Sequence, residues 1–243
     1  MKQRLDAEIA QRGLALSREA ARRLIMTGRV RVNSRPAAKP DLRVDQNAHI
    51  LVVGNDLEYA SRGAYKLIAA LDHFLVDPCG RYALDVGAST GGFTDVLLRR
   101  GAAHVIALDV GYGQLAERLR TDRRVTIIDR TNIRFVHPAD LPYTPDLIVV
   151  DTSFISLKLV LPPIIALAKP PADIIVLIKP QFEVGKGMVG KGGIVRDPEL
   201  HQRVIKEILQ YARGLSLETA MAIESPITGS SGNREFLARF RLI

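Results

Sequence analysis

The sequence predicts an α/β protein in which a small basic unit precedes a larger unit built on a parallel sheet. From residue 82 onward, short apolar strands alternate with amphipathic helical segments, which is the pattern of βαβ units. Four of these strands end in an aspartate, and a glycine-rich turn follows the first. Residues 1–43 hold eleven Lys/Arg against four Asp/Glu, a net +7 of the chain's +8.

The overall composition is that of a soluble globular protein. A length of 243 residues allows one large and one small domain, and 47% of the residues are hydrophobic. Cys79 is the single cysteine, which excludes an intramolecular disulfide and a cysteine-rich zinc site. The first six residues are polar, and the most apolar stretch, 159–168, contains two prolines and falls short of the ~20 residues of a membrane span. We therefore expect a cytoplasmic protein with no membrane span and no bound metal.

The first unit is predicted from its helix caps and turns. Ser17 is a good N-cap, and Gly28 a good helix terminator. Residues 30–32 alternate valine with arginine, as a half-buried strand does. The expected elements are, in order, a helix ending at Gly13, a helix from Ser17 to Gly28, a strand over 30–32, a turn at 33–34 and a closing strand over 49–53.

Arginines are concentrated in this first unit, at helix starts and along a strand. Such a row can follow a phosphate backbone, and a basic stripe on one module is typical of nucleic-acid binding. A solvated arginine surface with no partner is the alternative. The residues predicted to bind RNA are Arg4, Arg18, Arg22, Arg23, Arg29, Arg31 and Arg35.

The second unit is expected to follow a linker at residues 54–58, which divides the chain into domains 1–57 and 58–243. Lys66 lies near the start of its first helix, where the helix dipole disfavours a cation. A lysine in that position is therefore a candidate functional residue. The expected strands are 82–86, 104–109, 124–129, 147–151, 174–178, 217–224 and 235–243, the last two forming an antiparallel edge; the expected helices are 93–100, 157–167 and 197–213.

The glycine-rich turn after the first of these strands predicts a ligand site. Its spacing matches neither a dinucleotide fingerprint nor a phosphate loop, and Asp85 would repel a pyrophosphate. A carboxylate in this position suits a ligand with a cationic amino-acid tail, such as S-adenosylmethionine. The residues predicted to bind this cofactor here are Asp85, Gly87, Ala88, Ser89, Thr90, Gly91, Gly92 and Phe93.

Further acidic residues follow the neighbouring strands. Asp109 is placed to accept ribose hydroxyls, and Asp129 could meet an adenine amino group. A strand-end aspartate can also simply cap a helix or form a turn, and that alternative stays open for each of them. Residues 185–193 contain several glycines with Lys186 and Lys191, and predict either a mobile basic loop over the site or a plain flexible loop.

Four motifs together carry a resemblance to a known family. They are Asp85-Val86-Gly87 with its following turn, Asp151-Thr152-Ser153-Phe154, Lys179-Pro180-Gln181-Phe182-Glu183, and Ser225-Pro226 with Gly232-Asn233. The chain resembles the TlyA family, which groups with the FtsJ-like ribose 2′-O-methyltransferases. Its first 53 residues resemble the small RNA-binding domain named after ribosomal protein S-four.

The resemblance implies a Rossmann-like seven-stranded methyltransferase sheet, S-adenosylmethionine as donor, and ribosomal RNA or ribosomal subunits as partner. It also implies donor contacts at Asp129, Asp151 and Phe154. The family's catalytic set maps onto Lys66, Asp151, Lys179 and Glu224.

In the mechanism expected from this set, Lys179 acts as a base or steers the ribose hydroxyl, and Asp151 orients Lys179. Lys66 and Glu224 would then hold the ribose and the adjoining phosphate.

The sequence leaves three alternatives open. The family often carries a haemolysin label, so the chain could be a cytolytic protein, although it shows no span, signal or pore-forming repeat. It could also be a ribosome-assembly factor that binds RNA without catalysis. Finally, the methyl acceptor could be a protein or a small molecule.

Overall fold

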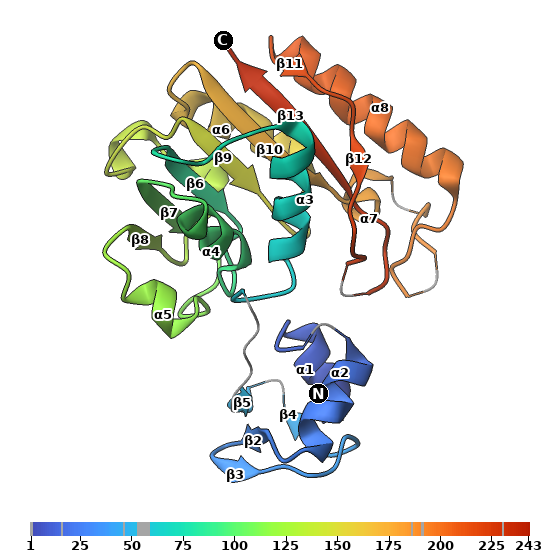
Figure 1. Cartoon of the computed structure of the whole chain (residues 1–243). Coiled ribbons are helices and arrows are strands. Elements are labelled where there is room, and N and C mark those ends of the chain that lie inside the picture. The colour runs from blue at the N-terminus through green and yellow to red at the C-terminus, as the bar shows by residue number, and fades with distance from the viewer. Residues whose placement is uncertain are drawn as a thin grey trace. The chain divides into compact units, whose positions relative to one another are not determined.

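The computed structural model describes residues 2–15, 17–45, 47–52, 59–185, 187–190, 192–229 and 231–243. The chain forms two compact units, Met1–Gly63 and Ala64–Ile243 (Figure 1). The predicted linker 54–58, the predicted domain boundary within it, and the two loop lysines, Lys186 and Lys191, lie outside the described residues.

The described residues of the smaller unit form two helices and five short strands. Its strands form a two-stranded antiparallel sheet, β1-β4, and a three-stranded sheet of order β3-β2-β5. Leu5, Ile9 and Ile25 are fully buried and fill the core between helices and strands. The elements are β1 (Lys2–Arg4), α1 (Leu5–Gln11), α2 (Arg18–Met26), β2 (Val30–Val32), β3 (Arg35–Pro36), β4 (Arg43–Asp45) and β5 (Ile50–Val52).

The predicted caps and turn of this unit are confirmed. The Ser17 hydroxyl accepts a hydrogen bond from the Ala20 amide at 3.1 Å and so caps α2. Gly28 follows the helix with φ +71°, the left-handed conformation that favours glycine. Asn33 and Ser34 both have positive φ in the turn between β2 and β3, as tight hairpins require.

The larger unit is a sheet covered by helices on both faces. In Figure 1 its strands lie side by side in the order β11-β13-β10-β9-β6-β7-β8, with β12 also paired to β13. The elements up to the sheet centre are α3 (Ala64–Phe74), β6 (Tyr82–Val86), α4 (Gly92–Arg99), β7 (His104–Leu108), α5 (Glu117–Arg120), β8 (Val125–Ile128), the short turns η1 (Ile133–Phe135) and η2 (Pro138–Asp140), and β9 (Leu147–Val150). They are followed by α6 (Leu157–Leu167), β10 (Ala172–Ile178), α7 (Pro180–Glu183), α8 (Pro198–Gly214), β11 (Glu218–Thr219), β12 (Ile223–Glu224) and β13 (Phe236–Leu242).

Burial explains the apolar runs in the central strands. Every residue of β9 is fully buried. Its Ile148 and Val150 belong to a core cluster that also includes residues of α6 and α8, as expected for a strand in the middle of a covered sheet. β6, β7, β8, β9 and β10 run parallel, whereas β13 is antiparallel to β10. The carboxyl ends of the parallel strands therefore meet along one rim of the sheet.

The predicted edge pair is confirmed as antiparallel, but its outer strand is divided. The segment predicted as one strand over 217–224 forms β11 and β12, both paired with β13 and separated by residues 220–222. The expected seven-stranded sheet therefore has eight strands among the described residues.

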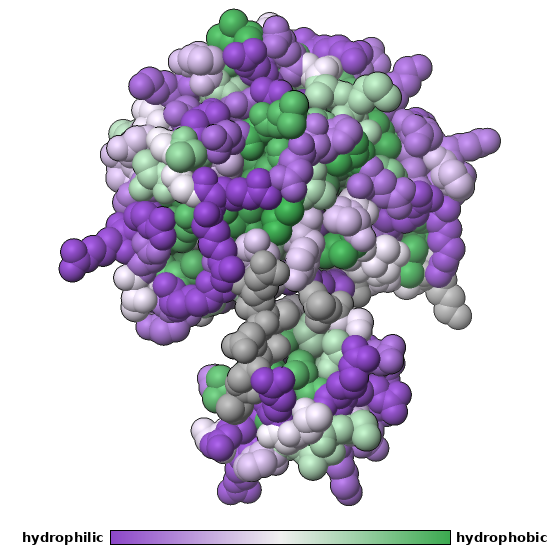
Figure 2. Space-filling model, viewed as in Figure 1, coloured by the Kyte–Doolittle hydropathy of each residue, from purple (hydrophilic) through white to green (hydrophobic). Residues whose placement is uncertain are grey.

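The surface of each unit is mixed. Figure 2 shows hydrophilic side chains over much of the visible face of both units, with apolar residues between them. None of the described helices is both long and apolar enough to cross a membrane.

Candidate active site

The glycine-rich turn after β6 adopts a backbone that only small residues allow. Gly87, Ser89 and Gly91 have φ values of +86°, +47° and +93°. A Cβ on Gly87 would lie 2.6 Å from the carbonyl oxygen of Asp151, and one on Gly91 would lie 2.3 Å from Leu119 Cδ1. Glycine is therefore needed at both positions, because the turn packs directly against the end of β9 and against α5.

Asp85 lies beneath this turn and is completely buried. Its Oδ2 accepts a hydrogen bond from the Thr94 hydroxyl at 2.6 Å, whereas Oδ1 has no partner among the described residues. Burial raises the pKa of Asp85 to about 7; the Thr94 hydrogen bond opposes this shift and the charge of Asp151 adds to it. A buried carboxylate oxygen without a partner fits a cationic group of a ligand seated on the turn.

Asp109 and Asp129 bind backbone amides around the same turn. Asp109 Oδ2 accepts from the Ser89 amide at 2.8 Å and Oδ1 from the Gly111 amide at 2.6 Å. Asp129 Oδ2 accepts from the Gly113 amide at 2.9 Å. Both carboxylates thus stabilise loops through backbone amides. This is the turn-forming role that the sequence allowed as an alternative to ligand binding. Each carboxylate oxygen has further acceptor capacity, so this role and ligand binding are compatible.

Two lysines and two carboxylates form a continuous chain of contacts beside the turn. Lys179 Nζ lies 2.6 Å from Asp151 Oδ1 and 3.0 Å from the Ser153 hydroxyl. Lys66 Nζ lies 3.9 Å from Asp151 Oδ2 and donates a 2.6 Å hydrogen bond to Glu235 Oε2. The sheet and α3 thereby bring together three of the four residues that the sequence assigned to catalysis.

Asp151 is held in its ionised form. Burial alone would raise its pKa, but the charges of Lys179 and Lys66 and the Lys179 hydrogen bond outweigh burial and hold the pKa below its usual range. Its side chain is 22% exposed, so solvent or a substrate can reach the carboxylate.

The structure does not bring Glu224, the fourth predicted residue, into this set. Its side chain is 46% exposed and forms an ion pair with Arg234. Glu224 pairs with Phe236 across β12 and β13, so both side chains lie on one face of the sheet. Glu235 precedes Phe236 and points to the opposite face, where its carboxylate, only 3% exposed, contacts Lys66.

Sequence reasoning therefore missed Glu235. The available signal was its place at the start of the final predicted strand, directly after the Gly232-Asn233 motif. Asn233 is itself buried and binds the segment that precedes α8. It accepts a hydrogen bond from the Val195 amide at 3.0 Å and donates one to the Gly193 carbonyl at 2.9 Å.

The two phenylalanines predicted near the donor have different surroundings. Phe93 is buried within α4, so its side chain serves the core. Phe154 is 91% exposed, has φ +63°, and lies with its ring centroid 5.1 Å from that of Phe182. Phe182 in turn lies close to Lys179, whose Nζ is 5.9 Å from the Phe182 ring centroid.

In the smaller unit, two of the predicted RNA-binding arginines have an internal partner. Arg4 and Arg18 each place a guanidinium nitrogen 3.0 Å from the carboxylate of Asp6, which is fully buried. Burial raises the pKa of Asp6, but the hydrogen bonds and charges of the two arginines outweigh burial and lower it. Arg4 and Arg18 therefore stabilise the fold around Asp6, whichever other role they have.

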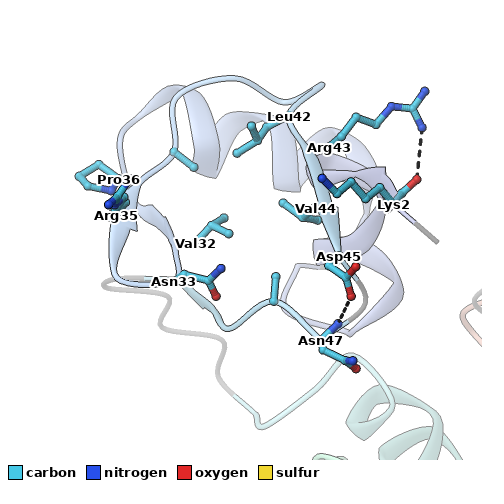
Figure 3. Close-up of a pocket in the computed structure, with 12 residues that line it drawn as sticks. Lys2, Val32, Asn33, Arg35, Pro36, Leu42, Arg43, Val44, Asp45 and Asn47 are labelled. Atoms are coloured by element: carbon cyan, nitrogen blue, oxygen red, sulfur yellow. Dashed lines mark hydrogen bonds between the residues drawn. The ribbon is translucent and has the colours of Figure 1, made fainter.

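The remaining predicted arginines are exposed: Arg22, Arg23, Arg29, Arg31 and Arg35. Arg35 also lines an open pocket of about 560 Å³ between the two sheets of the unit, shown in Figure 3. Val32 and Val44 point into this pocket, and Lys2 lies at its rim (Figure 3). The exposed cations and this pocket make the unit a candidate nucleic-acid surface.

Comparison with protein families matches both units. The model of the FtsJ-like methyltransferases matches residues 59–242, and the model of the S4 domain matches residues 3–50. The FtsJ-like match covers most of the chain and includes the turn, Lys66, Asp151, Lys179 and Glu235.

Two relatives match almost from end to end. The 16S/23S rRNA (cytidine-2′-O)-methyltransferase TlyA of Mycobacterium tuberculosis is 49% identical over 239 residues, which cover 98% of this chain and 89% of the relative. Hemolysin A of Brachyspira hyodysenteriae is 37% identical over 238 residues, covering 98% of this chain and 99% of the relative.

Two solved structures resemble this chain to different degrees. A candidate haemolysin from Streptococcus thermophilus superposes with a TM-score of 0.82 at 38% identity, covering 99% of this chain and 88% of that chain. An S-adenosylmethionine-dependent methyltransferase from Mesorhizobium loti, 14% identical, shares the fold alone, with a TM-score of 0.56 over 74% of this chain and 99% of that chain. The chain therefore belongs to the TlyA family of FtsJ-like methyltransferases that carry an S4 domain.

Proposed function

We propose that the protein transfers a methyl group from S-adenosylmethionine to a ribose 2′-hydroxyl of ribosomal RNA, with residues 1–57 binding RNA and residues 58–243 catalysing the transfer. The observation that carries this proposal is the contact chain Lys179–Asp151–Lys66–Glu235 beside the glycine-rich turn. The name of the M. tuberculosis relative, an rRNA cytidine-2′-O-methyltransferase, supports the choice of reaction and substrate.

The donor would be held by the turn and the acidic rim. Asp85 Oδ1, buried and without a partner among the described residues, suits the cationic amino group of the donor's amino-acid tail. Asp109 and Asp129 have the acceptor oxygens that ribose hydroxyls and an adenine amino group require. When bound, the donor supplies a methyl group already activated by its positively charged sulfur.

Lys179 is the residue we assign to the acceptor hydroxyl. An ammonium has three N–H donors, and two of them are directed at Asp151 and Ser153. The third is available to the ribose oxygen, and donating to it would leave a lone pair of that oxygen to face the methyl group. Asp151, held ionised, fixes the direction of the Lys179 amine. In this steering role the hydroxyl proton passes to solvent as the oxygen–methyl bond forms, whereas in the base role a neutral Lys179 amine would take that proton itself.

Lys66 and Glu235 support this arrangement from the side of α3. Glu235 is buried and accepts from Lys66, which in turn lies within ion-pair distance of Asp151. A buried ion pair is expensive to break, because each charge would lose its partner away from water. The pair therefore keeps Lys66 at a fixed place, from which it can bind the ribose or the adjoining phosphate.

The RNA substrate follows from the chemistry of the acceptor and from the basic unit. A 2′-hydroxyl exists in RNA and not in DNA, and the exposed arginines of the S4 domain supply phosphate contacts. An enzyme acting on ribosomal RNA would work in the cytoplasm, and we expect the protein there.

The decisive experiment is transfer of labelled methyl from S-adenosylmethionine to separated small and large ribosomal subunits, followed by mapping of 2′-O-methylated nucleotides. We expect label in the RNA of at least one subunit, with none when Lys179→Ala replaces the wild type. Label confined to protein, or no transfer to either subunit or to the free RNA, would overturn the proposal. Detergent-free protein added to red cells tests the haemolysin label, and we expect no lysis.

A further inference from the structure

The segment from Gly111 to Arg120 lies against the glycine-rich turn and contacts it at several points. The Ala116 amide donates to the Thr90 carbonyl at 3.2 Å, and the Ser89 hydroxyl donates to Gln114 Oε1 at 3.3 Å. Leu115 and Leu119 fill the space that a side chain on Gly91 would need. The same segment donates the Gly111 and Gly113 amides to Asp109 and Asp129. It therefore contacts both the turn and the acidic rim.

One ion pair ties this segment to the helix that follows the turn. Arg118, at the centre of α5, places Nη1 2.8 Å from Asp95 Oδ1 and Nη2 2.5 Å from Asp95 Oδ2. Asp95 lies in the first turn of α4 and its side chain is only 3% exposed. A guanidinium that binds both oxygens of a carboxylate fixes distance and orientation together, which a single hydrogen bond cannot do.

Asp95 has a second arginine partner, Arg99, which lies on the same helix as Asp95. Arg99 Nε lies 3.1 Å from Asp95 Oδ1, but both residues belong to α4, in an i, i+4 arrangement. The Arg99 contact therefore joins α4 to itself, whereas the Arg118 contact joins α4 to α5. The two arginines are similarly exposed, 45% and 47%, and share one acceptor, so they form a natural matched pair.

We propose that Arg118 is a positioning residue for donor binding: by tying α5 to Asp95 it keeps the glycine-rich turn in its binding conformation. This inference rests on the proposed function, since it takes S-adenosylmethionine as the ligand of the turn. Arg118 acts through the turn and is not assigned any contact with the donor.

The backbone of the turn explains why such support is needed. Ser89 is a non-glycine residue at φ +47°, and the two flanking glycines are the residues with the widest choice of other conformations. A free turn would populate conformations that do not bind the donor, and the apparent affinity falls with the fraction that does. Packing by Leu115 and Leu119 limits these alternatives only while α5 stays in place.

The test compares Arg118→Met with Arg99→Met in the full chain, using calorimetric binding of S-adenosylhomocysteine as the probe. Both variants lose one positive charge beside Asp95; Arg118→Met loses the two-point contact between α5 and α4, and Arg99→Met loses a contact within α4. We expect Arg118→Met to raise the dissociation constant about tenfold and Arg99→Met by less than about twofold. In methyl transfer, Arg118→Met should raise the KM for the donor in proportion while leaving kcat at saturating donor within about twofold of wild type.

Two controls separate loss of the contact from loss of charge or of folding. Arg118→Lys keeps the charge but loses the two-point contact, and we expect it to weaken probe binding as Arg118→Met does. Thermal unfolding of each variant identifies any that does not fold. Equal probe affinity in wild type, Arg118→Met and Arg118→Lys would overturn the role of Arg118, as would equal weakening by Arg99→Met. No binding of the probe to the folded wild type would instead overturn the proposed function.

Discussion

The Lys66 ammonium donates a buried 2.6 Å hydrogen bond to the Glu235 carboxylate, although 169 residues separate the two in sequence. The contact joins α3, at the start of the methyltransferase unit, to the residue preceding its final strand. Glu224, one strand away, forms an exposed ion pair with Arg234 instead. The structure thus distinguishes Glu224, the last residue of β12, from Glu235, which directly precedes β13.

Replacement of the two glutamates by glutamine should separate their roles. Glu235→Gln leaves the Lys66 charge buried beside a neutral amide, so we expect kcat for RNA methylation to fall by about 100-fold or more. Glu224→Gln changes an exposed surface pair and should alter kcat by less than about twofold. Single-turnover methyl transfer at saturating donor measures both. A larger loss in the Glu224 variant would reverse the assignment.

The role of Lys179 can be resolved with two substitutions. Lys179→Ala removes the only amine in contact with both Asp151 and Ser153 in the described structure, and should reduce kcat by about 10³-fold. Donor affinity should change by less than about threefold, because the turn and the acidic rim stay intact.

Lys179→Arg keeps a positive donor that never gives up its proton. Partial activity of this variant would show that Lys179 steers the hydroxyl, whereas activity as low as that of Lys179→Ala would show that a neutral amine is required as base. Near-normal turnover of Lys179→Ala would exclude both roles.

Asp85 makes the stability of the donor-free protein depend on pH. Its pKa is raised to about 7 by burial, from 3.8 for an exposed carboxyl. A raised pKa stabilises the fold fully below about pH 4, and this contribution is lost as the pH rises through about 7. Asp85→Asn cannot ionise and lacks this loss. Between pH 4 and pH 8 the free energy of unfolding of the wild type should fall relative to the variant by up to about 4 kcal/mol.

Denaturant unfolding of both proteins across this pH range is the measurement. S-adenosylmethionine should stabilise the wild type more strongly at pH 8 than at pH 5.5, because its cationic amino group favours the ionised Asp85. Parallel pH profiles for wild type and Asp85→Asn would contradict the buried, proton-binding state.

The exposed arginines of the S4 domain should act through phosphates. Arg22→Gln and Arg31→Gln are each expected to weaken RNA binding and to reduce the slope of log Kd against log salt by about one. Arg213→Gln, which removes the same charge from α8, serves as the matched control and should leave that slope unchanged. Fluorescence anisotropy with a ribosomal RNA fragment at several salt concentrations is the readout. A salt-independent affinity in the wild type would argue against phosphate contacts altogether.

Much of this architecture could be predicted from local sequence signals. Ser17, Gly28 and the 33–34 turn were placed correctly, because caps and tight turns depend on the residues immediately present. The strand order along the chain also follows the apolar segments of the sequence, and the structure brings together Lys66, Asp151 and Lys179, three of the residues that the sequence singled out.

The choice between Glu224 and Glu235 could not be predicted in the same way. It depends on which face of the sheet each side chain occupies, and a shift of one residue in a strand reverses that face. The break at residues 220–222 and the register of β12 on β13 decide it, and both are tertiary features of a sheet in which β11 contacts α8 and β13 contacts α3. The ion pairs of Arg4 and Arg18 with Asp6 could not be predicted for a related reason, because the burial of Asp6 depends on the tertiary fold.

The 169-residue separation of Lys66 and Glu235 also concerns folding. Contacts between distant parts of a chain form late and at a high entropic cost, so this pair can close only after the intervening strands have assembled and β13 has inserted beside β10. A partly folded chain could form the glycine-rich turn and yet lack the complete catalytic group. Recovery of methyl transfer during refolding should therefore lag behind recovery of helical signal, and activity becomes a reporter of the last long-range step.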